Sequence, residues 1–324
     1  MNPFPTSKFP SLVIFSLSIA ATTAPAGRAC SVCGCSLSSD WGSQGYATAL
    51  GLGADVSYQY YDQDNLRSGS GSADRSAYAF PNPREIQQDT LTRGATLDLD
   101  YAAGPAWGVD LQVPTYDRFH STVAPGDTAV SESRASGLGD VRLVARYQKF
   151  NPERSFAVQL GLKLPTGRID QDFATGPQAG APLDRGLQLG TGTTDLIAGV
   201  SYFGRPALNV GTFAEARVQQ ALAYRDGFLP SSTASLNVGV RYLNTSAVTP
   251  QLQLNARWDG RERGVNADTA NSGDAAFFVS PGLTAQLGAR QSVFAFLQLP
   301  VYQRVNGLQL DPRWLVSIGF RWRM

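Results

Sequence analysis

The chain of 324 residues has little of what redox, metal and catalytic centres are usually built from: one histidine, three cysteines and two methionines. Beyond its amino terminus it has no run of about 18 apolar residues, which excludes a bundle of membrane-spanning helices. It also lacks an excess of charge, since 27 basic residues are matched by 26 acidic ones. This balance argues against nucleic acid as a partner.

The first 29 residues have the order of features found in a bacterial secretory signal. Lys8 supplies a positive start, residues 12–21 have apolar character, and Ala24-Pro25-Ala26 is a small-residue cleavage motif. Cleavage is predicted after Ala26 or after Ala29. A transmembrane anchor is the alternative, but the apolar stretch is too short and is interrupted by serines. We therefore expect an exported protein with a cleaved signal peptide, 1–29.

What the chain does have is alternation, most clearly at its carboxy terminus. From Trp314 to Met324 every second residue is aromatic or aliphatic, and Arg321 and Arg323 lie between them. Successive side chains of a strand point to opposite faces, so one face is apolar and the other carries the arginines. In a water-soluble sandwich the arginines would face solvent. In a membrane barrel they would face a wet lumen, and the apolar stripe would face lipid.

About twelve segments have this strand-like character, each of roughly ten residues, the length that crosses a membrane at a tilt. From Val158 to Leu164, for example, an aliphatic residue occupies every second position. The twelve segments lie near 48–62, 91–102, 107–118, 139–150, 155–166, 192–203, 207–220, 234–244, 249–259, 275–287, 291–302 and 313–324.

The connections between these segments alternate in length. Short links lie at 104–106, 151–154, 204–206, 245–248 and 288–290, and long polar stretches lie at 63–90, 119–138, 167–191, 221–233, 260–274 and 303–312. Outer-membrane barrels have short periplasmic turns and long external loops, and a soluble sandwich has no reason for this regularity. The stretch at 63–90, rich in Ser, Gly and Asp, is interpreted as a mobile loop or a lid.

We therefore predict an all-β fold: a single antiparallel up-and-down transmembrane β-barrel over 47–324, with both termini in the periplasm. A periplasmic or lumenal segment, 30–46, precedes it. Aromatic residues near strand ends are expected to form girdles at the two membrane surfaces. These residues are Tyr58, Tyr60, Trp107, Tyr147, Tyr202, Trp258, Trp314 and Trp322.

Three phrases occur in order along the chain: GLGDV at 137–141, GLKLPTGR at 161–168 and LGTGTTDL at 189–196. With them the chain, over most of 90–324, resembles the family of outer-membrane transporters associated with the meta-pathway of phenol degradation. The resemblance implies a barrel that admits small, often aromatic or hydrophobic, molecules. Taken as residues alone, the phrases have structural roles: glycines permit close approach and turns, and Asp140 can accept from nearby backbone donors.

The three cysteines, Cys30, Cys33 and Cys35, fall in the short segment CSVCGCS, which departs from the pattern of that family. Thiolates at this spacing can hold a soft metal such as copper(I) or zinc. In the oxidising periplasm they can equally form a disulfide, Cys30–Cys33 or Cys30–Cys35, with one thiol left over. Both interpretations stay open. No CxxCH motif is present, which excludes covalent haem attachment.

Alternation assigns a set of charged side chains to the lumen. The expected pore-lining bases are Arg142, Arg146, Lys163, Arg217, Arg241, Arg257, Arg321 and Arg323, and the expected acids are Asp55, Asp98, Asp100, Asp110, Asp195 and Glu215. Early strands supply most of the acids, so the interior would carry either a transverse field or a network of ion pairs. Phe294 and Phe296 are in phase with Gln298 and would place two aromatic rings on the lumen face.

The single histidine, His120, is expected to be a solvated residue at a loop edge, because no orienting group for a His–Ser catalytic pair is evident. An enzyme is therefore the least favoured class. The leading hypothesis is passive diffusion of small hydrophobic or aromatic solutes through an outer-membrane channel, with lipid, the solute and the barrel-insertion machinery as partners. The alternatives are a metal-linked envelope barrel that uses the three cysteines, and a barrel sheath around a redox or envelope partner.

Overall fold

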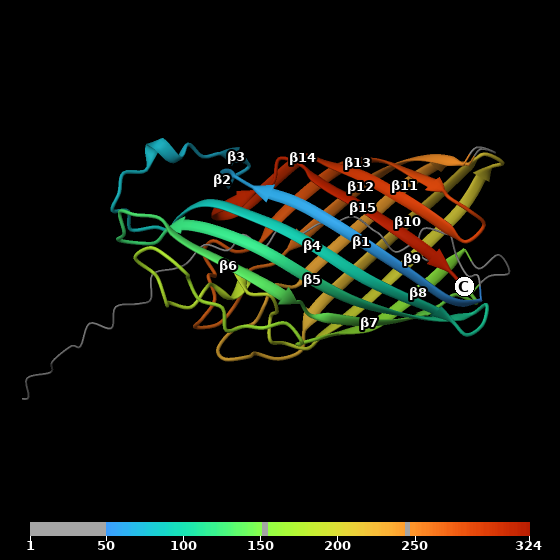
Figure 1. The fold of residues 1–324 in the computed structure, drawn as a ribbon, viewed down its shortest axis with the longest axis horizontal. Coiled ribbons are helices and arrows are strands. Elements are labelled where there is room, and N and C mark those ends of the chain that lie inside the picture. Colours follow the sequence, from blue (N-terminus) through green and yellow to red (C-terminus); the bar gives the residue numbers. More distant parts are fainter. Residues whose placement is uncertain (1–49, 151–154, 244–246) are drawn as a thin grey trace, which may run out of the picture.

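A computed structural model describes residues 50–150, 155–243 and 247–324, and over these residues twelve antiparallel strands form a closed barrel (Figure 1). The ring is closed by pairing of the first strand with the last, in which Gly53 lies opposite Arg323. The strands are β1 (Gly51–Gln63), β4 (Ile86–Ala102), β5 (Trp107–Val123), β7 (Val141–Tyr147), β8 (Phe156–Leu164), β9 (Asp195–Ala207), β10 (Val210–Ala221), β11 (Thr233–Tyr242), β12 (Val248–Asp259), β13 (Asp274–Gln286), β14 (Gln291–Asp311) and β15 (Leu315–Arg323). The predicted barrel is confirmed.

The alternation seen in the sequence separates an apolar exterior from a polar interior. On β8, Leu160 is 58% exposed, whereas the adjacent Gln159 is 2% exposed. On β11, Val238 is exposed and Asn237 is buried. A continuous band of exposed aliphatic side chains is unfavourable in water and matches the hydrocarbon core of a membrane. The chain is thus a β-barrel of the outer membrane. No helix in the described part of the chain is long and apolar enough to cross a membrane.

Aromatic side chains border this apolar band at both of its ends. At the end with the short turns, Trp107 packs against Tyr147 with ring centroids 4.6 Å apart and the rings tilted by 51°. At the opposite end, Tyr60 stacks on Trp314 at 5.5 Å. Aromatic rings with one polar atom are favoured at membrane surfaces, so these residues mark the two interfaces, as the sequence predicted.

The connections alternate in length as predicted, and the long ones gather at one end of the barrel (Figure 1). The loop at 165–194 joins β8 to β9 and contains a short 3-10 turn, η2 (Arg185–Leu187). Because β1 begins and β15 ends at the short-turn end, the two ends of the barrel sequence meet there. We refer below to the short-turn end and the long-loop end.

Three of the predicted boundaries are wrong at the long-loop end. β14 continues through the predicted loop 303–312 and pairs there with β2 (Asn65–Gly69), which lies in the predicted loop 63–90. That loop also contains β3 (Gly71–Ser72) and the 3-10 turn η1 (Arg75–Ala77).

The predicted loop 119–138 contains the end of β5 and a further strand, β6 (Ser131–Leu138), which pairs with β5. At the short-turn end, the predicted link 204–206 is part of β9. The extensions at the long-loop end rise above the apolar band, where both faces of a strand can be polar. Pairing there leaves no alternating apolar signal in the sequence.

Candidate functional site

The barrel encloses a cavity of about 360 Å³ in its long-loop half. Its wall is made of inward side chains from β1, β4, β5 and β7 to β12. Residues 185–191 of the β8–β9 loop and residues 228–231 of the β10–β11 connection complete the lining. The cavity therefore lies within the bore and beneath the loop at 165–194, where a solute passing through the barrel would have to pass.

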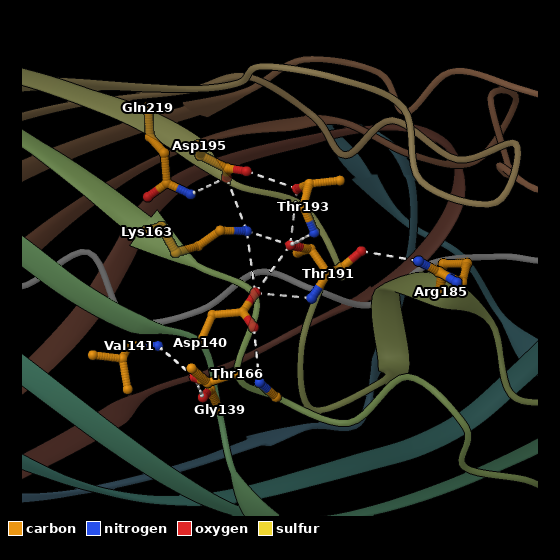
Figure 2. Close-up of polar contacts among 11 residues, drawn as sticks. Gly139, Asp140, Val141, Lys163, Thr166, Arg185, Thr191, Thr193, Asp195 and Gln219 are labelled. Carbon is orange, nitrogen blue, oxygen red and sulfur yellow. Dashed lines mark hydrogen bonds and ion pairs between the residues drawn. The ribbon is translucent and has the colours of Figure 1, made fainter.

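Lys163, near the end of β8, is the centre of a buried polar network under this loop (Figure 2). Its Nζ lies 3.1 Å from Oδ2 of Asp140 and 2.9 Å from Oδ2 of Asp195, and it donates to the hydroxyl of Thr191. Lys163 is only 2% exposed. A buried ammonium group is stable only with such partners, so the network is a requirement of the fold as well as part of the cavity wall.

The two carboxylates of this network bind the ends of the loop to the barrel. Asp140 accepts from the backbone N–H of Gly167 at 3.0 Å and from both the N–H and the hydroxyl of Thr191 at 2.9 Å. Asp195 accepts from the hydroxyl of Thr193 and from the amide of Gln219, each at 2.7 Å (Figure 2). Hydrogen bonds to charged acceptors are short and strong, which fixes both ends of the loop at one point.

Two glycines allow the loop ends to touch each other. A Cβ added to Gly167 would lie 2.6 Å from Cα of Gly190, and one added to Gly190 would lie 2.5 Å from Oδ1 of Asp140. The three sequence phrases therefore converge in space. Each supplies a part of the same junction: Asp140 from the first, Lys163 and Gly167 from the second, and Gly190 from the third.

The middle of the loop has a small hydrophobic core of its own, made of Phe173, Leu183 and Leu187. Arg118 of β5 holds it over the bore by donating to the carbonyl oxygens of Leu187 at 2.9 Å and Gln188 at 3.2 Å. The sequence reasoning missed Arg118, because nothing in its surroundings marks it as a partner of a segment about 70 residues away. The loop therefore has its own core and defined contacts with the barrel, and it covers the cavity.

His120 is not the solvated loop residue that the sequence suggested. It is an inward residue of β5 and is 1% exposed. Its Nδ1 lies 2.8 Å from Oγ1 of Thr90, and its ring centroid lies 6.3 Å from that of Phe173. The expectation was wrong because β5 continues to Val123, which keeps His120 in the inward phase beneath the loop core.

The predicted lumenal charges fall into two groups. Those that line the cavity are Asp55, Asp98, Arg142, Lys163, Asp195, Glu215, Arg217 and Arg257. The others, Asp100, Asp110, Arg146, Arg241, Arg321 and Arg323, lie outside this cavity on strand positions nearer the short-turn end. Arg323 is within electrostatic range of Asp100 and Arg146.

Most of these charges are paired locally. Arg146 lies 3.3 Å from Asp100, Arg217 3.2 Å from Glu215, Arg257 2.5 Å from Asp259, and Arg321 3.4 Å from Asp55. Acids and bases are thus neighbours on the wall, and they do not form two opposed charged sides. Of the two arrangements that the sequence left open, the contacts match the network of ion pairs.

Phe294 and Phe296 point into the barrel, and each is 3% exposed. Their rings cover glycines of the adjacent strands: a Cβ on Gly319 would lie 2.3 Å from Cζ of Phe294, and one on Gly282 would lie 2.1 Å from Cδ1 of Phe296. The rings therefore occupy space that a side chain on the neighbouring strand would otherwise fill. This gives the lumen an apolar wall segment on β13 to β15.

The cysteines Cys30, Cys33 and Cys35 lie outside the described residues, so the copper or zinc site and the disulfide both stay predictions. Among the residues that the structure does describe, no group of three or more His, Cys, Asp and Glu side chains is placed to hold a metal ion.

The sequence matches no family model and no curated protein. The fold is similar to that of an outer membrane channel from Pseudomonas putida F1, with a TM-score of 0.64 and 13% identity over 85% of this chain and 96% of that one. This likeness shows the fold alone; the Pseudomonas protein is a channel. The resemblance to the meta-pathway transporters stays a prediction.

Two further structures are similar over most of their length. The toluene transporter TbuX of Ralstonia pickettii has a TM-score of 0.45 and 10% identity, over 86% of this chain and 90% of that one. The CymD monoaromatic hydrocarbon channel has a TM-score of 0.44 and 8% identity, over 86% and 89%. At these TM-scores the likeness carries no argument about this chain.

Proposed function

We propose that the chain forms a passive channel for small hydrophobic or aromatic solutes across the outer membrane. The observation that carries the proposal is the cavity inside the bore, whose polar wall also presents the apolar side chains of Tyr116, Leu189, Ile197 and Phe228. Ligand sites for small organic molecules combine apolar surface with a few fixed polar groups in this way. The short-turn end is assigned to the periplasm, as in other outer-membrane barrels.

Two further features support this function. Phe294 and Phe296 place two inward, packed aromatic rings in the wall nearer the short-turn end, outside the cavity itself. The fold is that of an outer-membrane channel barrel, and the phrases at 137–141, 161–168 and 189–196 resemble those of transporters for aromatic compounds. Diffusion down a gradient needs no energy source, and the sequence offers no motif for energy coupling.

The proposal is tested by conductance and by uptake of a hydrophobic probe. Purified protein in planar bilayers should give discrete conductance steps, and a variant in which 170–188 is replaced by a short glycine–serine link should give larger ones. Intact cells that express the protein should take up 1-N-phenylnaphthylamine faster than vector-only cells, while both continue to exclude vancomycin, which reports leakage of the membrane. Absence of both conductance and faster probe uptake would refute the proposal.

A further inference from the structure

Arg142 of β7 stands out among the cations that line the cavity. In the described part of the chain it has no ion pair and no hydrogen bond from its side chain, although it faces the cavity directly. We infer that Arg142 is a recognition site for the carboxylate of a small aromatic acid. This inference deepens the proposed channel function, on which it rests, by naming a solute class.

The neighbours of Arg142 on both adjacent strands are already occupied. Its register partner on β8 is Lys163, which is held by Asp140 and Asp195. Its register partner on β5 is Gln112, whose amide donates to Asp98 at 3.3 Å. Asp98 belongs to β4, two strand spacings or about 10 Å from Arg142 across the sheet. Neither register partner of Arg142 is therefore a carboxylate that could neutralise its guanidinium.

Two other guanidinium groups face the same cavity without a close carboxylate. Arg118 donates hydrogen bonds to the carbonyl oxygens of loop residues 186–188. Arg185 donates to the carbonyl of Thr191 at 2.9 Å, and its carboxylate partner, Asp226, is 3.9 Å away. Together with Arg142, these guanidinium groups give the cavity donors that can hold an anion, although carboxylates also line it.

Three of the acids that line the cavity are held by partners of their own. Asp140 and Asp195 together carry one charge more than Lys163, but their oxygens accept from Gly167, Thr191, Thr193 and Gln219. These donors satisfy the carboxylates where they stand. Glu215 is paired with Arg217 at 3.2 Å. These carboxylates are thus held in fixed contacts, whereas no side-chain contact of this kind holds Arg142 in the described part of the chain.

An aromatic ring lines the same cavity as this guanidinium. Tyr116 of β5 lines the cavity, and its ring covers Gly139, where an added Cβ would be 2.5 Å from Cε2. Tyr116 is four residues along β5 from Gln112, the register partner of Arg142, so the ring and the guanidinium face the cavity from neighbouring strands. A benzoate-like molecule can place its carboxylate on the planar donor edge of Arg142 and its ring against Tyr116.

The same geometry favours an aromatic acid over an uncharged aromatic molecule. A hydrocarbon in the cavity would remove water from Arg142 and offer no acceptor in exchange, which is unfavourable for a charged group. A carboxylate replaces that water with charge-assisted hydrogen bonds. A small acid without a ring, such as acetate, would satisfy Arg142 but gain nothing from Tyr116.

The test is isothermal titration of the full chain in detergent micelles with benzoate, benzyl alcohol and acetate at neutral pH, with empty micelles as the blank. Arg142→Gln should weaken benzoate binding about tenfold or more, as expected for loss of a charge-assisted contact, and leave the response to benzyl alcohol unchanged. The matched control is Arg257→Gln. It removes the same charge from the same cavity, but from an arginine already paired with Asp259.

Benzoate should bind the wild type more tightly than either acetate or benzyl alcohol, and added salt should weaken it. Equal benzoate affinity in the wild type and Arg142→Gln would overturn the inference, as would an equal loss in Arg257→Gln. Binding in micelles needs no open pore. Arg142-dependent binding without conductance would therefore refute the channel and keep the site, and conductance without such binding would do the reverse.

Discussion

Lys163 and Asp195 are register partners on neighbouring strands, and the ammonium of the first lies 2.9 Å from the carboxylate of the second. The contact stands where the wall of the bore meets the loop at 165–194. Asp140, just before β7, contacts the same ammonium and also accepts from Gly167 and Thr191 at the two ends of the loop. The Lys163 ammonium therefore links two positions of the barrel with both loop ends. The cover and the barrel are thus coupled through a single buried cation.

Lys163→Met tests whether the loop is attached to the barrel through this ammonium group, when it is compared with removal of a lysine elsewhere. The substitution leaves two buried carboxylates without a counter-charge, a change that typically costs about 3–5 kcal/mol. We expect a lower midpoint of urea unfolding and noisier conductance as the loop detaches. Lys149→Met, at an exposed lysine near the short-turn end, is the control and should behave like the wild type. Equal unfolding midpoints for the two variants would contradict the role of Lys163.

Gly190→Ala should loosen the loop while leaving the barrel closed. The added methyl group would lie 2.5 Å from Oδ1 of Asp140 and 2.6 Å from the carbonyl oxygen of Gly167, so the loop ends must move apart. Trypsin should then cleave within the loop, at Arg168 or Arg185, although the protein still migrates as a folded barrel on unheated gels. Gly104→Ala has open space around the added methyl group and should stay resistant.

The burial of His120 beneath the loop can be tested with two substitutions. If the residue is buried beneath the loop core, His120→Leu should lose about 1 kcal/mol, the value of one hydrogen bond to Thr90. His120→Lys should reduce the folded fraction much more, because it buries an ammonium group with no carboxylate partner. A solvated histidine would accept either residue. Similar folded fractions for the two variants on unheated gels would therefore restore the original expectation.

The aromatic rings on the wall can be tested by moving one of them. Gly319→Ala places a methyl group 2.3 Å from Cζ of Phe294, so the ring must turn into the bore and the single-channel conductance should fall. Phe294→Ala alone should raise the conductance slightly. The double variant should return it to at least the wild-type value, since the methyl group then meets no ring. Additive effects of the two substitutions would show that ring and glycine are independent.

The sequence was sufficient for the barrel and for the direction of its side chains. The lipid-facing and lumen-facing sides differ in polarity along most of each strand, and the phase with Gln298 is why the inward direction of Phe294 and Phe296 was predictable. The strands above the apolar band were not predictable. Ser131–Leu138, for example, is polar on both faces, so β6 arises from backbone pairing with β5, which leaves no periodic signal.

The junction beneath the loop was only half visible in the sequence. The three phrases marked Asp140, Gly167 and Gly190 as local turn and strand-entry residues, because spacing along the chain reports only local geometry. Their meeting around Lys163 depends on the register of β7, β8 and β9, which a single sequence does not fix. The contact of Arg118 with the loop could not be predicted either, because the groups that accept from Arg118 are backbone carbonyls, which have no side-chain signature in the sequence.

The junction of the loop with the barrel also has a consequence for engineering. The loop is fastened to the wall at its two ends. Residues 170–188 also meet β5 through Arg118 and His120, and they meet β6 through the pairing of Glu132 with Thr175. The loop is therefore a segment that can be replaced while its attachment to the barrel is kept. Foreign segments inserted between Arg168 and Leu189 should dock where they keep the pairing with Glu132 of β6, and the solute preference of the barrel could be exchanged by swapping this one insert.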